Sequence, residues 1–105
     1  MILEVADISI NPASKADFEK AVVAGISEAI APAIGFRGYK LNSGIENPGR
    51  YILMIYWETL ENHTVDFRES DAFLKWRSHV GPFFLQAPVV ENFTLASKCY
   101  LRFSF

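Results

Sequence analysis

The chain has 105 residues, a length that suits one domain over residues 1–105 and leaves no room for a second. Hydrophobic residues make up 50% of it and aromatic residues 14%, which is rich for a small monomer and predicts that some surface is buried against another subunit. A net charge of −2, with no basic patch, argues against nucleic acid as a partner.

Three further features concern location. No apolar stretch reaches the roughly 18 residues that a membrane helix needs, so we expect no membrane association. Residues 1–10, MILEVADISI, lack the basic start and cleavage site of a signal peptide. The single cysteine, Cys99, excludes an internal disulfide and lies in a strand pattern, where a small buried side chain is expected. These features predict a cytoplasmic protein.

The first elements in chain order are a strand and a long helix. Residues 2–10 are rich in β-branched side chains and predict a strand. A helix is predicted over 12–31, because apolar residues recur at every fourth position. Either Asn11 or Ser14 can cap its N-terminus.

Two strands follow as a hairpin, over 36–43 and 50–57, around the turn GIENPG. The second of them, RYILMIYW, is apolar on both faces, so neither face should meet water. One face can pack on the chain's own helices, but no helices remain to cover the other. We therefore expect a homodimer in which a second copy of the sheet covers the open face.

The second half predicts two helices, over 60–69 and 71–80, with Thr59 and Ser70 as their caps. A last strand is predicted over 90–103. The order β-α-β-β-α-β predicts an α+β, ferredoxin-like antiparallel sheet with helices on one face.

Both histidines and both tryptophans lie in the segment 57–84. Helical spacing places His63 on one stripe with Leu60 and Phe67, and a second aromatic stripe follows on the next helix. The pattern predicts an apolar pocket between sheet and helices for a small aromatic ligand. The candidate substrate-binding residues are Trp57, Phe67, Trp76, His79 and Phe83. Charged neighbours such as Arg68 indicate a solvated helix face.

Histidine suits proton transfer because its pKa lies near neutrality, so His63 is the candidate catalytic base. Removing a proton from a phenol leaves an electron-rich anion that can pass an electron to oxygen, so neither a cofactor nor a metal is expected. The competing interpretation is that these side chains only pack the core, which is the commoner role of a histidine among apolar residues.

The strand YILMIYW, followed at once by ETLENH and then by FRESDAFLKW, resembles the antibiotic biosynthesis monooxygenase family. The resemblance covers nearly the whole chain, and Trp57 with His63 six residues later is its most specific part. It implies a dimeric α/β barrel, with two ferredoxin-like subunits whose sheets lie face to face. It also implies a pocket in each subunit, used by different members for cofactor-free oxygenation of phenols, quinone metabolism or haem degradation.

Carried over residue by residue, the resemblance fits in part. Trp57 matches a site tryptophan of the polyketide-modifying members, and His63 stands where they have a tyrosine. Leu53 replaces their asparagine, so one polar group is missing. Compared with the haem-degrading members, Phe67 falls near their tryptophan and Arg77 near their haem-ligating histidine. Haem degradation is therefore disfavoured.

The sequence supports two hypotheses about function. The first is a cofactor-independent monooxygenase that acts on a small aromatic, phenolic or quinone-type compound. The second is a non-catalytic dimeric α/β-barrel protein that binds a small molecule or responds to stress. Leu53 favours the second, and a rate that depends on His63 would favour the first.

Overall fold

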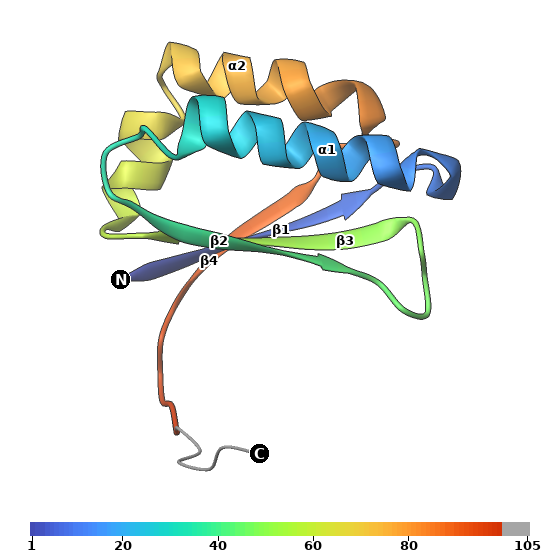
Figure 1. Ribbon diagram of the computed structural model, residues 1–105. Coiled ribbons are helices and arrows are strands. Elements are labelled where there is room, and N and C mark those ends of the chain that lie inside the picture. Colours follow the sequence, from blue (N-terminus) through green and yellow to red (C-terminus); the bar gives the residue numbers. More distant parts are fainter. Residues whose placement is uncertain (100–105) are drawn as a thin grey trace, which may run out of the picture.

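The computed structural model describes residues 1–99 (Figure 1). Four strands and two α-helices make up its regular structure: β1 (Ile2–Ser9), α1 (Lys15–Gly25), β2 (Phe36–Ser43), β3 (Arg50–Trp57), α2 (Asp71–Val80) and β4 (Val89–Thr94). Two π-helical segments, η2 (Ile26–Ile30) and η3 (Asn62–Phe67), and two 3-10 turns, η1 (Pro12–Ser14) and η4 (Gly81–Phe83), complete it.

The strands form one antiparallel sheet in the order β2-β3-β1-β4, and both helices lie on the same face of it (Figure 1). The predicted α+β, ferredoxin-like fold is confirmed. In the part of the chain that the structure describes, no helix is long and apolar enough to cross a membrane.

Strand β3 alternates as its sequence predicts. Tyr51 and Trp57 are almost completely buried beneath the helices, as are Leu53 and Ile55 between them. The side chains on the opposite face, Ile52, Met54 and Tyr56, are only half-buried in the single chain. One face of the sheet therefore holds the core, while the other presents apolar side chains with no cover from the described part of the chain.

The predicted last strand, 90–103, is too long. Strand β4 ends at Thr94 because Thr94 pairs with Ile2, the first residue of β1, and β1 offers no further residue for pairing. Cys99 lies beyond the strand and is exposed, which corrects the expectation of a buried side chain. Residues 100–103 of the prediction lie outside the described residues.

The helix predicted over 60–69 is mostly π-helical. The N–H of Arg68 donates to the carbonyl of His63 at 3.1 Å, a bond that spans five residues instead of four. The wider turn breaks the predicted stripe, since His63 and Phe67 are buried while Leu60 is 41% exposed.

The predicted caps are only partly correct. Thr59 caps this segment through its hydroxyl oxygen, which accepts the N–H of Asn62. Asn11 likewise accepts the N–H of Ala13. The hydroxyl of Ser70 instead donates back to the carbonyl of Phe67, so it does not cap α2.

Gly35 permits the chain to turn from η2 into β2. Its φ of +83° lies in the left-handed region, and its carbonyl accepts the N–H of Glu58 at 2.8 Å. A Cβ atom at this position would lie 2.1 Å from the Asn62 side-chain oxygen, which itself accepts the N–H of Thr59. A residue with a side chain at position 35 would therefore clash with Asn62 and would also be strained by the left-handed backbone conformation.

We expect Gly35→Ala to lower the free energy of unfolding by at least about 1–2 kcal/mol, because an L side chain is strained in the left-handed region. Displacement of Asn62 adds to this loss. Gly38→Ala is the matched control: Gly38 also has a positive φ, but a Cβ atom there meets nothing within 4 Å. Urea unfolding measures both variants, and equal destabilisation would show that the Asn62 contact is unimportant.

Candidate functional site

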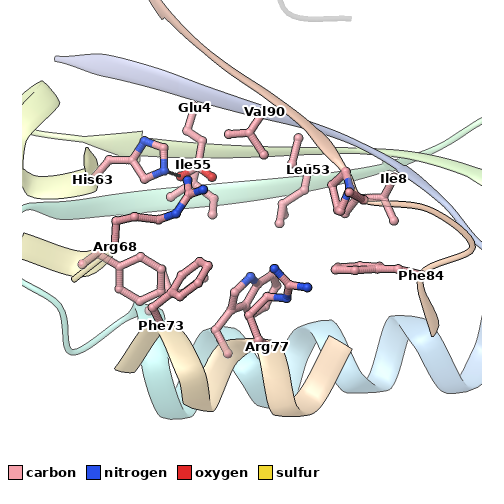
Figure 2. A pocket seen from close by; sticks show the side chains of 16 residues that line it. Glu4, Ile8, Leu53, Ile55, His63, Arg68, Phe73, Arg77, Phe84 and Val90 are labelled. Atoms are coloured by element: carbon pink, nitrogen blue, oxygen red, sulfur yellow. Dashed lines mark ion pairs between the residues drawn. The ribbon is translucent and has the colours of Figure 1, made fainter. Parts of the chain in front are cut away.

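A cavity of about 170 Å³ lies between the helix-covered face of the sheet and the helices (Figure 2). In this view His63 and Glu4 lie at one end and Phe84 and Ile8 at the other, with Arg77 between them. Apolar side chains of β1, β3 and β4 form the sheet side of the wall, and those of η2, η3 and α2 contribute to the helix side. The space is mostly apolar, with a few polar groups at defined positions, as in binding sites for small organic molecules.

A buried hydrogen-bonded group joins three strands to η3. The indole N–H of Trp57 donates to Oε1 of Glu4 at 2.9 Å. Nε2 of His63 lies 3.3 Å from the same carboxylate oxygen, and its Nδ1 lies 2.8 Å from Oδ1 of Asn92. Both ring nitrogens of His63 therefore have partners, although His63 itself is 3% exposed.

These partners determine where protons can reside. An amide oxygen only accepts, so Nδ1 of His63 carries a proton and donates it to Asn92. Nε2 then remains as the position that gains or loses a proton beside Glu4. When it is protonated, the carboxylate balances the charge of the imidazolium. Nε2 of His63 and the carboxylate of Glu4 therefore form a polar pair at this end of the cavity.

Burial raises the pKa of Glu4 above the ordinary value of 4.5. Three neighbours oppose this effect of burial: the imidazolium of His63, the hydrogen bond from Trp57 and the positive charge of Arg68. The carboxyl group accordingly holds its proton more tightly in the folded chain than in the unfolded one.

Aromatic packing by Trp57 supports the histidine ring. The indole of Trp57 stacks on His63 with centroids 5.9 Å apart and an angle of 11° between the planes. Phe67 packs against the same indole, with ring centroids 5.6 Å apart. Trp57 is completely buried and does not line the cavity, although it is a predicted substrate-binding residue; it packs against His63 behind the cavity wall.

The structure brings only some of the predicted residues to the cavity. His63, Phe67 and Trp76 line it. His79 instead points to the neighbouring helical segment, where its Nε2 lies 2.5 Å from Oε2 of Glu28. Phe83 packs edge-on against Phe18, and its neighbour Phe84 takes the place at the cavity wall.

Four polar residues of the site are not found by sequence reasoning: Glu4, Arg68, Arg77 and Asn92. Arg68 lines the cavity, which corrects its assignment to a purely solvated face. Glu4 had one detectable signal, because it is the single charged residue in the alternating series Ile2, Glu4, Ala6, Ile8, Ile10. Nothing in the sequence indicates that Asn92 meets His63, 29 residues away.

Among residues 1–99, no group of three or more His, Cys, Asp or Glu side chains is arranged to hold a metal ion.

The family model for antibiotic biosynthesis monooxygenases matches residues 1–79. The chain belongs to the antibiotic biosynthesis monooxygenase family. It is 34% identical over 97 residues to the uncharacterised protein YczJ of Bacillus subtilis, a match that covers 89% of this chain and 97% of the relative.

Solved structures agree with this assignment. A protein from Bordetella bronchiseptica, provisionally named an antibiotic biosynthesis monooxygenase, is 40% identical, with a TM-score of 0.86 over 91% of this chain and 97% of its own. A Streptomyces coelicolor monooxygenase, solved with the ligand nanaomycin D, has a TM-score of 0.82 over 95% of this chain and 91% of its own. At 16% identity, the latter shows a shared fold alone.

The raised pKa of Glu4 predicts a pH-dependent stability. The native state binds this proton more tightly, so the free energy of unfolding contributed by Glu4 is greatest below pH 4.5 and falls as the pH rises through its raised pKa. Glu4→Gln cannot titrate but still accepts a bond from Trp57. We expect the stability of the unmodified protein, relative to Glu4→Gln, to decrease in urea unfolding as the pH rises above 4.5. A difference that is constant or increases would contradict the assigned burial effect.

Proposed function

We propose that this family member oxidises a single-ring phenol with molecular oxygen, using His63 and Glu4 as the proton acceptor and no cofactor. The observation that carries the proposal is the buried His63–Glu4 pair at the end of an apolar cavity. Membership of a monooxygenase family supports it. The volume of about 170 Å³ favours a single ring, since a benzene-sized ligand occupies an apolar cavity of about 150 Å³.

The chemistry begins with proton transfer. The phenol O–H gives its proton to the His63–Glu4 pair, and the resulting phenolate passes one electron to oxygen, which gives a phenoxyl radical and superoxide. Their recombination forms a C–O bond at a ring carbon. Loss of the ring C–H proton and cleavage of the O–O bond then give a quinone and water, so one phenol and one oxygen molecule account for all atoms. The proton on the pair returns to the departing hydroxide.

The second candidate is a binding protein without catalytic activity. Leu53 supports it, because it presents an apolar side chain to the cavity where the polyketide-modifying members that the sequence resembles have an asparagine. Fewer groups are then available to hold the oxygen of a substrate. Both candidates share the cavity and differ only in whether a rate depends on His63.

Oxygen uptake by the purified, metal-stripped protein tests the proposal, with hydroquinone, catechol and the larger anthrone as substrates. We expect uptake above the buffer rate with the single-ring phenols, and a loss of roughly 10²- to 10⁴-fold in His63→Ala, as for removal of a general base. His79→Ala is the matched control, since His79 lies against Glu28 and away from the cavity. Uptake unchanged in His63→Ala would refute the assigned base, and no uptake with any phenol would favour the binding protein.

We also propose that two copies associate through the open face of the sheet, as the family resemblance implies. Ile52, Met54 and Tyr56 are half-buried there, and Phe93 is 47% exposed. An apolar hollow lies beside Tyr56 and Phe93, and its lining also includes Met1 and Leu3. Covering such a patch with an identical one removes apolar surface from water on both copies.

Light scattering at micromolar concentration is expected to give the mass of two chains. Tyr56→Asp places a charge in the middle of the proposed interface and should shift the mass toward one chain. Lys20→Asp is the control, because Lys20 is exposed on α1, on the opposite side of the sheet from the proposed interface. A monomer mass for the unmodified protein would refute this arrangement.

A further inference from the structure

Two arginines form a positively charged rim on the cavity. Arg68 follows η3 and Arg77 lies on α2, and Figure 2 shows both side chains directed toward the enclosed space. Both are also in contact with solvent. Neither side chain belongs to the polar group around His63, so the proton chemistry proposed above leaves them without a role.

Aromatic rings hold the two guanidinium groups in place. The guanidinium carbon of Arg77 lies 5.5 Å from the ring centroid of Phe84 and 5.9 Å from that of Phe73. The guanidinium carbon of Arg68 lies 5.1 Å from the Phe73 ring as well. A stacked guanidinium keeps its N–H donors available at the edge of its plane, and its side chain loses less freedom when a ligand binds.

The positive charge of this rim is not balanced within the site. Among residues 1–99, Glu4 is the only carboxylate that lines the cavity, and its Oε1 already accepts from Trp57 and lies next to His63. Among the described residues, neither Arg68 nor Arg77 forms a hydrogen bond or ion pair through its side chain, whereas Arg37 and Arg50 pair with Glu58 and Asp7. The chain as a whole carries a net charge of −2, so the charge of the two arginines is opposite in sign to that of the whole chain.

The two arginines are not equivalent. The charge of Arg68 acts on Glu4 and offsets a small part of the rise in its pKa that burial causes, so Arg68 already interacts with a charged group inside the site. Arg77 has only aromatic contacts and lies between the His63 end and the Phe84 end of the cavity. It is therefore the better placed of the two to bind an anionic group of a ligand.

We propose that the ligand is an aromatic carboxylate, whose ring occupies the apolar cavity and whose carboxylate binds Arg77, with Arg68 adding positive charge. The planar guanidinium presents paired N–H donors that match the two oxygens of a carboxylate. The volume limits the ring system to one ring. The inference rests on the proposed function only for placing the hydroxyl group of that ring beside His63.

Anaerobic calorimetry tests this inference apart from any turnover. The probe is 2,5-dihydroxybenzoate, compared with its neutral methyl ester. We expect the acid to bind roughly 10- to 100-fold more tightly than the ester, the range for a hydrogen bond to a charged partner. Arg77→Met, which keeps an apolar stem against Phe84, should remove most of this preference, and Arg68→Met should reduce it less. Arg77→Lys keeps the charge but loses the paired donors, so its preference should be intermediate.

Arg37→Met is the matched control, since it removes the same charge from a surface residue outside the cavity and should leave the preference intact. Equal affinity of acid and ester, an unchanged preference in Arg77→Met, or no binding of the acid at millimolar concentration would each overturn the inference. Tight, Arg77-dependent binding of the acid without oxygen uptake would support the inference and refute the oxygenase. Oxidation of neutral phenols, together with an acid affinity that is unchanged in Arg77→Met, would support the oxygenase and refute the inference.

Discussion

A carboxylate removed from water must find partners for its charge, and Glu4 finds a hydrogen-bond donor in Trp57 and an ion-pair partner in His63. This requirement connects β1, β3 and η3 at one point below the helices. The indole that donates to Glu4 also stacks on the imidazole, so the same contact that satisfies the carboxylate fixes the ring of the base. Replacing one member of the group leaves a buried polar atom on another, and for this reason the three residues act as a unit.

The sheet divides the molecule into two environments. Its helix-covered face encloses a cavity whose inner end holds a carboxylate and an imidazole, and whose rim holds two guanidinium groups. A ligand with a hydroxyl group at one end and an acid at the other fits this separation of chemical groups. On the opposite face β3 carries Ile52, Met54 and Tyr56, whose apolar or weakly polar side chains suit association with a second chain.

Much of the fold could be predicted from local patterns, because strand alternation and helix ends depend on neighbouring residues. For this reason the predicted buried face of β3 and the predicted bounds of α2 agree with the structure. The site could be predicted only in part. His63 and Trp76 stand out as unusual residue types, but Asn92 reaches His63 from a distant strand. The π-helical turn that exposes Leu60 arises from tertiary packing that helical periodicity does not encode.

Strand β4 has a consequence for the relation between assembly and chemistry. It lies at the edge of the sheet, with one side paired to β1 and all its residues largely exposed. Yet this least protected strand carries Asn92, whose amide oxygen selects the tautomer of the buried imidazole. Any chain that paired with the outer edge of β4 would therefore lie on the same strand that supplies a hydrogen-bond partner to the interior histidine, so an assembly through this edge and the cavity would share one strand.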